Sequence, residues 1–513
     1  MRLTQTLRRA VLVRPDETAT IDGERVRTWR EVHERVGRLS AGLRKLGVAA
    51  GDRVAVLANN CDAYFEAYFA ILWTGAVIVP LNTRLAPAET RFQLEDAGVS
   101  VMLFGEEFAG VAALLRPQLP GIGAWIGMDG PDVSADHALE ALVVGEPAPE
   151  TMRNAEDLAG IFYTGGTTGL PKGVMLSHRA LSAMAVNLTM SLKVDESLVN
   201  LHSAPMFHLA DIGTFMATMV GGAHVFVRKL DETVMLDLIG RRGVTHIFTV
   251  PAMIDRLARH PAAATTDISS LKVLGYGGAP MPLGTYDVAR ARFPDVDFVQ
   301  GFGMTEMGAH TFLEAKHHRP GADPEKMRSV GQPAYGYEAM IVDPEGREVP
   351  RRTLGEIVGR GDNVMSGYWN RPEETARALR DGWMWSGDAG FMDEEGFVYI
   401  TDRFKDMIVS GGENVYSIEV ENVVSRHPAV AECAIIGVPD ERWGERVHVV
   451  VVTKSQASVT LDELATHCRA EIAGYKVPRS LQILETPLPR SAAGKVLKTD
   501  LRAPWWAGHE RRI

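Results

Sequence analysis

Apolar, strand-like runs alternate with helical stretches through about the first 330 residues, and this alternation constrains the fold more than any other feature. The runs include VSVMLF, LAGIFYT, AHVFVR, THIFTV and LKVLGYGG. Strands that alternate with helices along a chain typically form largely parallel sheets whose faces are covered by helices. The sequence therefore predicts the α/β class, with a large N-terminal domain of helix-covered, largely parallel sheets.

Two stretches predict local elements in more detail. Residues 18–28, TATIDGERVRT, are typical of two short strands joined by a turn. Thr28 and Glu31 have the capping-box spacing of a helix start, and apolar residues then recur at helical intervals up to Gly47. Residues 67–82, AYFAILWTGAVIVPLN, predict a buried helix and a buried strand, because the run is short of a membrane span and contains Gly and Pro.

After about residue 330 the pattern changes to short strands and turns. IVDPEGREV and GFMDEEGFVYI predict hairpins and a small β-rich part of the first domain. The last hundred or so residues alternate again, with strands AECAIIGV and VHVVVV and a helix from Leu461, which predicts a small α+β domain. We place the boundary near Asp402, so that the domains are residues 1–401 and 402–513.

Composition narrows the class of protein. A net charge of -11 and a pI near 5.8 argue against a nucleic-acid partner, since such proteins usually carry a basic excess. The cysteines, Cys61, Cys433 and Cys468, form no C-x-x-C pair, so neither a disulfide framework nor a zinc site is expected. The N-terminus lacks the apolar core of a secretory signal, and we expect a cytoplasmic protein without a transmembrane segment.

A loop rich in glycine and threonine follows the strand LAGIFYT. Glycines allow backbone N–H groups to turn toward one centre, threonines add hydroxyl donors, and a lysine adds positive charge, which together suit a polyphosphate. The residues concerned are Thr164, Gly165, Gly166, Thr167, Thr168, Gly169 and Lys172. The loop lacks the G-x-x-x-x-G-K-[ST] spacing of a P-loop. The alternative is a tight turn with a solvated lysine.

Further motifs occur in an order that carries a resemblance. YTGGTTGLPKGV is followed by PMFH, GYGGAP, GFGMTE, WSGDAG, TDRFKDMI, SGGENVYSIEVE and PRSAAGKVLK. With these motifs, almost the whole chain resembles the adenylate-forming enzymes, the superfamily of acyl-CoA synthetases, firefly luciferase and the adenylation domains of nonribosomal peptide synthetases. Two positions depart from the family pattern, since Gly165 stands where Ser is common and Phe302 where Tyr is commoner.

The resemblance implies an AMP-forming acyl-CoA synthetase with ATP and CoA as co-substrates and Mg²⁺ as cofactor. A carboxylate attacks the α-phosphate of ATP, and the thiol of CoA then displaces AMP. The implied catalytic residues are His208, Thr305, Glu306 as the Mg²⁺ ligand, and Lys495, which bridges the carboxylate and the α-phosphate. Besides Lys495 and the glycine-threonine loop, the implied ATP and AMP contacts are Gly277, Gly278, Ala279, Gly301, Phe302, Gly303, Met304, Thr305, Asp388 and Arg403.

The same resemblance assigns the second half of the reaction to the small domain. Rotation about Asp402 would move Lys495 out of the site and bring in the CoA side, formed by Ser410, Gly411, Gly412 and Glu413. For the acyl pocket it implies Phe207, His208, Val250, Tyr276, Gly301 and Met307. A purely structural role remains the alternative for His208, and core packing remains the alternative for Phe302.

The apolar character of the pocket residues favours a hydrophobic carboxylic acid, with a medium- or long-chain fatty acid first and an aryl acid of the benzoate or hydroxycinnamate type as the alternative. Asp211 keeps an amino acid open, because a carboxylate could pair a substrate ammonium. An acyl-AMP ligase that loads a carrier protein also stays open, and so does an inactive nucleotide-binding homologue. The oligomeric state is left open, a homodimer included.

Overall fold

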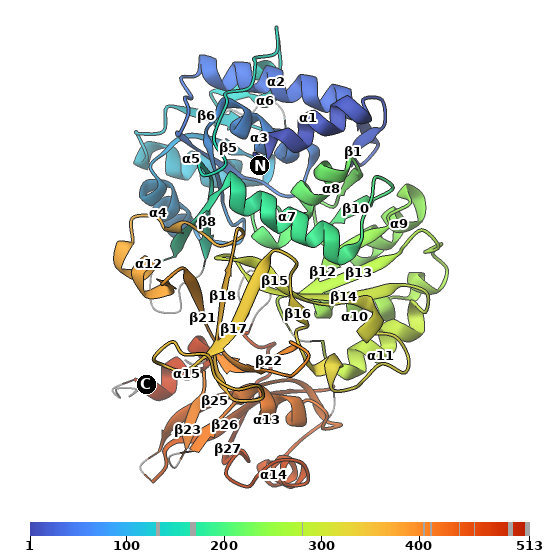
Figure 1. Cartoon of the computed structure of the whole chain (residues 1–513), viewed down its shortest axis with the longest axis vertical. Coiled ribbons are helices and arrows are strands. Elements are labelled where there is room, and N and C mark those ends of the chain that lie inside the picture. The colour runs from blue at the N-terminus through green and yellow to red at the C-terminus, as the bar shows by residue number, and fades with distance from the viewer. Residues whose placement is uncertain are drawn as a thin grey trace. The chain divides into compact units, whose positions relative to one another are not determined.

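A computed structural model gives the fold of the chain (Figure 1). It describes residues 1–129, 134–164, 171–279, 281–403, 406–410, 413–440, 442–455, 457–490 and 496–507. The chain forms two compact units. The first unit is Met1–Glu338 with Gly359–Met384, and the second is Ala339–Val358 with Trp385–Ile513.

The first unit contains two sheets with parallel interiors, one with antiparallel pairs at both edges and the other with antiparallel pairs at the β19 edge only. One sheet has the strand order β16 (Gln332–Pro333), β15 (Gly308–Leu313), β14 (Asp297–Met304), β13 (Val273–Gly277), β12 (His246–Thr249), β10 (Val199–His202), β11 (Ala223–Phe226), β1 (Thr18–Asp22) and β2 (Arg25–Thr28). The other has the order β19 (Gly367–Tyr368), β9 (Lys172–Ser177), β8 (Leu158–Thr164), β4 (Val77–Pro80), β3 (Arg53–Leu57), β5 (Val99–Phe104), β6 (Ala124–Gly127) and β7 (His137–Ala138).

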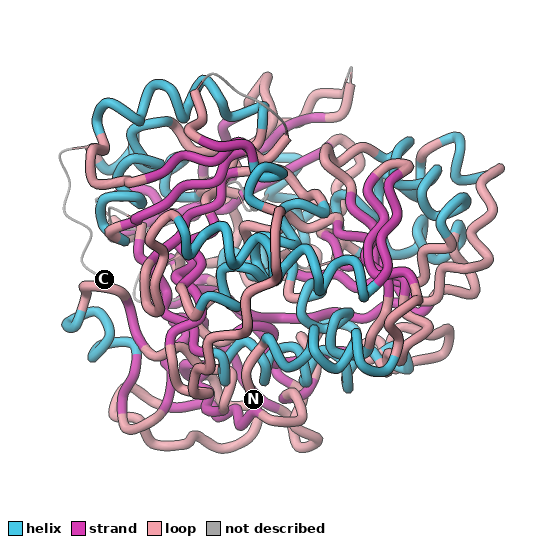
Figure 2. Tube along the Cα trace, turned by 90° about the horizontal axis from the view of Figure 1, so that it is seen from above, coloured by secondary structure: helices cyan, strands magenta, loops and turns pink. Residues whose placement is uncertain are grey.

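Helices pack along these strands, as the secondary-structure colouring of Figure 2 shows. Those of the first unit are α1 (Thr4–Val13), α2 (Trp29–Lys45), α3 (Asp62–Thr74), α4 (Pro87–Ala97), α5 (Ala109–Leu115), α6 (Leu139–Leu142), α7 (His178–Leu192), α8 (Gly213–Val220), α9 (Glu232–Arg242), α10 (Pro251–Arg259), α11 (Leu283–Arg292) and α12 (Pro372–Ala378). Ile247, Leu274 and Phe298 from the β12–β14 strands lie in one core with buried residues of α9, α10 and α11 (Figure 1).

The local predictions for the first unit are confirmed. Thr28 and Glu31 form a reciprocal capping box at the start of α2. The predicted buried helix is α3, which is followed by the fully buried strand β4. Gly75 ends α3 with φ of +82°, a left-handed conformation that glycine adopts without the steric cost of a Cβ atom.

A third sheet, the predicted β-rich part, has the order β17 (Tyr337–Val342), β18 (Gly355–Gly361), β21 (Trp383–Met392) and β20 (Leu379–Arg380), with β22 (Val398–Arg403) paired to β21. The division between the units falls within its strands. The fourth sheet, in the second unit, has the order β24 (Glu413–Val415), β23 (Ile408–Ser410), β26 (Gly444–Thr453) and β25 (Val430–Asp440), with β27 (Ser480–Ile483) paired to β26. Helices α13 (Ser417–Val424), α14 (Leu461–Arg469) and α15 (Lys498–Trp506) complete this unit.

This architecture confirms the predicted fold class, a large α/β N-terminal domain with a smaller mixed domain after it. The two predicted hairpins are also confirmed, since Val342 bridges Glu348 and β21 pairs antiparallel with β22. The domain boundary at Asp402 differs from the point where the compact units divide, and it stays a proposal about the reaction cycle.

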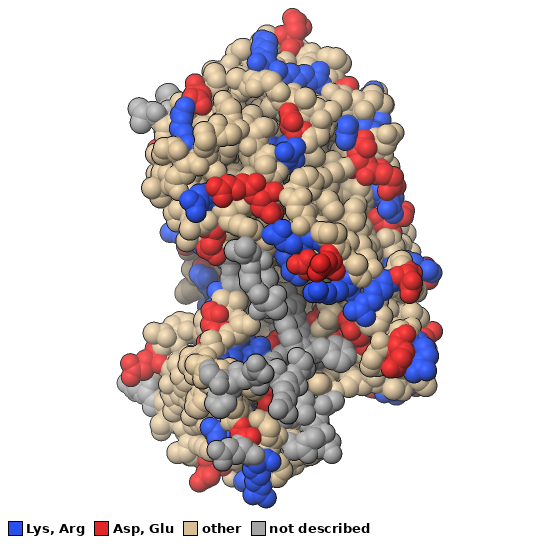
Figure 3. Space-filling model, turned by 90° about the vertical axis from the view of Figure 1, so that its left-hand side faces the viewer, with Lys and Arg blue, Asp and Glu red and all other residues tan. Residues whose placement is uncertain are grey.

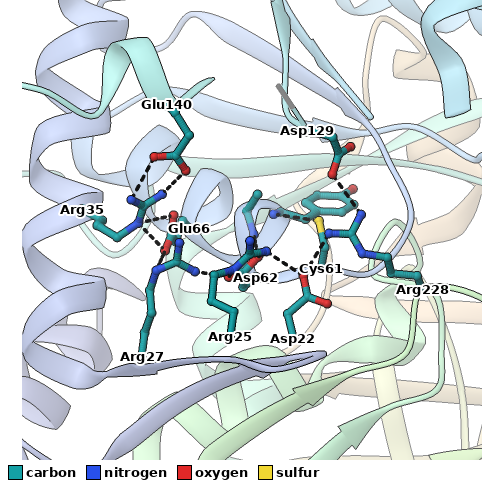
Figure 4. Close-up of polar contacts among 12 residues, drawn as sticks. Asp22, Arg25, Arg27, Arg35, Cys61, Asp62, Glu66, Asp129, Glu140 and Arg228 are labelled. Atoms are coloured by element: carbon teal, nitrogen blue, oxygen red, sulfur yellow. Dashed lines mark hydrogen bonds and ion pairs between the residues drawn. The ribbon is translucent and has the colours of Figure 1, made fainter. Parts of the chain in front are cut away.

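A row of ion pairs ties β2, α2 and α3 together (Figure 4). Arg25 donates from Nε and Nη2 to the two carboxylate oxygens of Asp62, at 2.6 Å each, and Arg27 contacts the same carboxylate. Arg35 donates from Nε to both oxygens of Glu66, at 2.8 and 3.0 Å. Further pairs extend the row through Glu140, Asp22, Arg228 and Asp129. Asp62 and Glu66 are each only 1% exposed, so the row carries buried charge.

On the surface, acidic and basic side chains lie beside one another, as the face drawn in Figure 3 illustrates. Within the described ranges, every helix is too short or too polar to span a membrane.

Candidate active site

The strand before the glycine-threonine loop and the strand after it form a hairpin. In the β8–β9 pairing, Thr164 stands opposite Lys172, and the Thr164 hydroxyl lies 3.5 Å from the Lys172 carbonyl oxygen. The hairpin therefore brings together the first and last residues of the proposed phosphate loop. Residues 165–170, which include Gly165, Gly166, Thr167, Thr168 and Gly169, lie outside the described ranges.

Lys172 and Glu306 both contact one tyrosine, Tyr368. Strand β19 adds to the edge of β9 and places Tyr368 opposite Val174. The Tyr368 hydroxyl donates a hydrogen bond of 2.8 Å to Oε1 of Glu306, and the Lys172 Nζ lies 4.9 Å from the centroid of the same ring. The proposed phosphate lysine and the proposed metal ligand are thus joined in space through Tyr368.

Tyr368 is a residue that the sequence did not single out. It is buried, and burial together with the charge and hydrogen bond of Glu306 raises the pKa of its hydroxyl well above the usual value. The phenol therefore stays protonated and serves Glu306 as a fixed donor. In the sequence, Tyr368 stands in the segment SGYWNRPEE. Nothing in that segment indicates a contact with Glu306, which is 62 positions away.

One face of the β12–β14 strands is lined with glycines. Gly275, Gly277 and Gly301 leave room for the ring of Phe248, which a Cβ atom at any of the three would approach to between 2.4 and 3.3 Å. Glycine in a strand often marks a close approach of another group. Phe248, another residue that sequence reasoning missed, therefore forms an aromatic wall over proposed ATP and acyl contacts.

The loop that follows β13 continues the wall formed by Phe248. Gly278 has φ of +76°, and a Cβ atom added there would lie 3.9 Å from Cγ1 of Val250. Ala279, the next residue, is exposed. The side chain of Tyr276 instead lies in the core with α10 and α11, where its hydroxyl is 2.8 Å from Nε2 of His318.

The GFGMTE segment forms the end of β14 and the turn into β15. Phe302 is half-buried, with its ring edge-on to His310 at 4.7 Å between centroids. The pairing of β14 with β15 is irregular between Phe302 and Gly303, and a Cβ atom at Gly303 would lie 1.9 Å from the carbonyl oxygen of Gly308. Met304 is the last residue of β14 and is half-buried, and Thr305 is the first residue of the turn.

Glu306 and Met307 are held in this turn by the strand segments that follow. Glu306 accepts the Met365 N–H through its carbonyl oxygen, in addition to the Tyr368 contact of its side chain. Met307 is fully buried, and its sulfur accepts a hydrogen bond from the Tyr337 hydroxyl at 2.8 Å. The position of the Glu306 carboxylate is therefore fixed from both its backbone and its side chain.

His208 precedes the short helix η3 (Leu209–Asp211). Its segment is clamped by Asn60, whose amide donates to the carbonyls of His202 and Ala204 and accepts the Met206 N–H, all at 2.8 Å. His208 and Asp211 line a cavity of about 10 Å³. Phe207 beside His208 is buried.

In the second unit, the β21–β22 pairing places Asp388 opposite Arg403 and Ala389 opposite Asp402. The two proposed ribose residues thus occupy facing backbone positions. Ser410 pairs with Glu413 in the β23–β24 hairpin and with Gly444 of β26. Gly411, Gly412 and Lys495 lie outside the described ranges.

The segments that carry these residues match known enzyme families. Residues 7–369 match the AMP-binding enzyme family, and residues 419–495 match the AMP-binding enzyme C-terminal domain. The chain belongs to the AMP-binding enzymes. The two matched regions include the Lys172–Tyr368–Glu306 group and much of the small domain. The resemblance inferred from the motifs is therefore confirmed.

Similar proteins narrow the reaction type. A feruloyl-CoA synthase from Amycolatopsis sp is 41% identical over 95% of this chain and 96% of its own length. The long-chain-fatty-acid–CoA ligase FadD13 from Mycobacterium tuberculosis is 35% identical over 94% of this chain and 93% of its own. The solved amide bond synthetase McbA from Marinactinospora thermotolerans has a TM-score of 0.89 at 28% identity, covering 98% of this chain and 100% of its own.

These findings make the chain an adenylate-forming enzyme of the acyl- and aryl-CoA ligase family, an AMP-forming acid–thiol ligase that acts on small molecules. ATP and CoA fit this family as co-substrates. The predicted enzyme class is therefore confirmed.

Proposed function

We propose that the protein activates a hydrophobic carboxylic acid with ATP and transfers the acyl group to CoA. The acid's oxygen forms a bond to the α-phosphorus, pyrophosphate leaves, and the CoA sulfur then forms a bond to the acyl carbon as AMP leaves. The observation that carries the proposal is the Lys172–Tyr368–Glu306 group, because a cation and a hard carboxylate that both contact one tyrosine suit a metal-bound triphosphate.

In the first half-reaction, Lys172 and the threonines of its loop bind phosphate oxygens. Glu306 would hold Mg²⁺ through its carboxylate oxygens, which are the ligands this ion prefers, and Thr305 would contact a phosphate. The described residues bring together no group of three or more His, Cys, Asp and Glu side chains as a metal site, and Mg²⁺ held by one carboxylate and substrate phosphates needs none. The ion would supply charge neutralisation at the phosphates.

For the second half-reaction we keep Asp402 as the hinge and residues 402–513 as the moving domain. Lys495 would serve adenylate formation by neutralising both the attacking carboxylate and the α-phosphate. Ser410, Gly411, Gly412 and Glu413 would then line the path of the CoA thiol, where the absence of glycine side chains permits close approach.

A cationic and aromatic cluster next to this path supports CoA as the acceptor. The guanidinium carbons of Arg442 and Arg479 lie 4.7 and 4.6 Å from the ring centroid of Trp443. Trp443 precedes Gly444, the partner of Ser410 across the β23–β26 pairing. CoA carries a purine and three phosphates, which suit an indole face and arginines, whereas a carrier protein's pantetheine arm carries no nucleotide.

Replacing Arg479 by Gln is expected to raise the KM for CoA about tenfold, since a hydrogen bond to a charged group is lost. The KM for pantetheine, which lacks the nucleotide, should stay unchanged. Initial rates of thioester formation with both thiols measure this, with Arg469→Gln on α14 as a control for loss of an exposed arginine. An equal rise for CoA and pantetheine would contradict the assignment.

For the acid we propose an aryl substrate of the hydroxycinnamate type first. Phe248 offers a flat face for an aromatic ring, and such pairs add about 0.5–1.5 kcal/mol beyond area burial. The 41% identity with the feruloyl-CoA synthase supports the same class. The fatty acid favoured by the pocket's composition is the second candidate, supported by the 35% identity with FadD13.

A panel of ferulate, coumarate, benzoate, octanoate and palmitate tests both the function and the acid. Purified protein with ATP and Mg²⁺, with and without CoA, should give AMP and a thioester with the hydroxycinnamates only when CoA is present, as followed by mass spectrometry. Lys495→Ala should lower the rate by at least about 10²- to 10³-fold. Thioesters of the aliphatic acids alone would move the proposal to fatty acids, and an acyl-adenylate without thioester would move the acceptor to a carrier protein.

A further inference from the structure

A buried polar network lies behind the wall that carries His208. Both carboxylate oxygens of Asp211 are 2.9 Å from Nδ1 of His202. The Nε2 of His202 is 2.9 Å from Nδ1 of His224, whose Nε2 is 3.2 Å from the Thr218 hydroxyl. The network thus joins η3, β10, β11 and α8 through groups that are all buried. Buried polar groups are costly unless they are satisfied, and these groups satisfy one another.

The contacts of His202 fix the donor that faces Asp211. Nδ1 of His202 lies within hydrogen-bond distance of both carboxylate oxygens of Asp211 and donates to them. His224 is neutral, because burial lowers its pKa well below the usual value. Nε2 of His202 contacts His224 and, at 3.4 Å, the Asn200 amide, so both ring nitrogens have partners.

The network meets a cavity at its carboxylate end. His202, His224 and Thr218 are fully buried, whereas Asp211 is 8% exposed and lines the 10 Å³ cavity together with Tyr68 and His208. A space of this size holds about one water-sized group. Asp211 also accepts the Thr214 hydroxyl at 2.8 Å, and a carboxylate with these two partners has lone pairs left for one more donor.

We propose that Asp211 is a specificity-determining residue that accepts a hydrogen bond from a hydroxyl group of the acid, so that the preferred substrates are aryl acids with a phenolic hydroxyl. This inference rests on the proposed function, and it names the substrate class of the same site. A hydroxyl oxygen fills the volume of one water molecule, and the carboxylate takes its proton as an acceptor. The cavity takes the hydroxyl alone, and the other side chains that line it include the apolar Phe162 and Phe215.

The acceptors left on Asp211 decide between a hydroxyl and an ammonium group. A bare carboxylate would pair a substrate cation, as in an enzyme for amino acids. Here both oxygens of Asp211 already contact His202, and one also accepts from Thr214, so the three N–H donors of a buried ammonium would exceed the remaining acceptor capacity. A neutral donor such as a phenol has a single proton to place and gains the hydrogen bond in full.

The test compares acids that differ at one group. Wild-type protein is assayed with 3- and 4-hydroxycinnamate, 4-methylcinnamate, cinnamate and 4-(aminomethyl)cinnamate, and kcat/KM is taken from AMP formation with CoA present. We expect the better hydroxycinnamate to exceed 4-methylcinnamate by about 10- to 150-fold, the effect of one hydrogen bond to a charged group. A ratio near one for both hydroxyl positions, or a preference for the aminomethyl acid, overturns the proposal.

Two variants locate the effect. Asp211→Asn should reduce the hydroxyl-to-methyl ratio about tenfold or more, because the charged acceptor is lost. Asp195→Asn, at an exposed aspartate before β10, is the control and should keep the wild-type ratio. An unchanged ratio in Asp211→Asn contradicts the proposal.

The outcomes separate this inference from the proposed function. If cinnamate and 4-methylcinnamate yield thioester as fast as the hydroxylated acids, the CoA ligase activity stands and only the role of Asp211 fails. If none of the acids in either panel is turned over, both fail. Should Asp211→Asn not fold, the wild-type comparison of hydroxyl, methyl and aminomethyl acids decides by itself.

Discussion

Replacing Glu306 by Gln is expected to slow acyl-adenylate formation by about 10²- to 10³-fold, because the charge that holds Mg²⁺ against the triphosphate is lost. The amide has nearly the shape of the carboxylate and can still accept the Tyr368 hydrogen bond, so the fold should be retained. Acid-dependent exchange of labelled pyrophosphate into ATP measures this half-reaction alone.

The second half-reaction provides an internal control for this variant. Transfer from a supplied acyl-adenylate to CoA needs no triphosphate, so Glu306→Gln should keep most of that rate. Glu373→Gln, at an 83% exposed carboxylate on α12, is the matched control and should leave both half-reactions unchanged. Equal losses in the two half-reactions of Glu306→Gln would contradict a role confined to the phosphates.

A substitution at Tyr368 tests the same contact with Glu306 from the tyrosine. Tyr368→Phe removes the hydroxyl that fixes Glu306 and leaves the ring beneath Lys172, so we expect a smaller loss, about tenfold, in pyrophosphate exchange. Because the two residues act on one metal position, the double variant should be little slower than Glu306→Gln. Additive effects would mean that Tyr368 acts through Lys172 instead.

Much of the fold was predictable because its signals are local. The capping box at Thr28 and the apolar run of α3 depend on neighbours within a few positions, and the structure confirms both. The division into units was less predictable. Strands β17, β18 and β21 interleave segments of both units, and no composition change marks where contacts separate.

The candidate site was predictable only where a motif names a residue. Glu306 and Lys172 carry their chemistry in their own segments, whereas Tyr368 gains its role from contacts with residues far away in the sequence. Phe248 was missed for the same reason. Its position over Gly275 and Gly277 depends on the register of β12 against β13, which the sequence alone does not fix.

Asp211 was already singled out from the sequence, and the structure changes the ligand expected at its carboxylate. From sequence it was a carboxylate that could pair a substrate ammonium. The register of β10 with β11 places Asn200 opposite His224, with His202 two residues further along β10 and its ring stacked on His224 at 5.1 Å between centroids. The spacing of Asp211, His202 and His224 in the chain shows nothing of this network, and the network changes the expected ligand from a cation to a neutral hydrogen-bond donor.

Replacing Asp62 by Ala is expected to lower the free energy of unfolding by about 3 kcal/mol, because the mostly buried Arg27 loses its nearest carboxylate. Among the described carboxylates, Arg27 then keeps only Glu66, at 3.5 Å, and the half-exposed Arg25 keeps only Asp22. Burial opposes the charge of Asp62, but the hydrogen bond from Arg25 and the nearby guanidinium charges outweigh it and hold its carboxyl pKa below the usual value. Glu66 is the weaker choice, because burial raises its pKa despite Arg35.

Asp62→Asn separates charge from shape at this position, since it keeps the side-chain volume and should lose nearly as much stability as Asp62→Ala. Urea unfolding at pH 7, followed by the fluorescence of the first unit's tryptophans, measures both variants. Glu373→Ala, which breaks an exposed pair with Arg377, should stay within about 0.5 kcal/mol of the wild type. If Asp62→Ala unfolds no earlier than this control, apolar packing between α2 and α3 suffices to hold them together. The ion pairs would then offset only the desolvation cost of their own charges and add nothing to the free energy of unfolding.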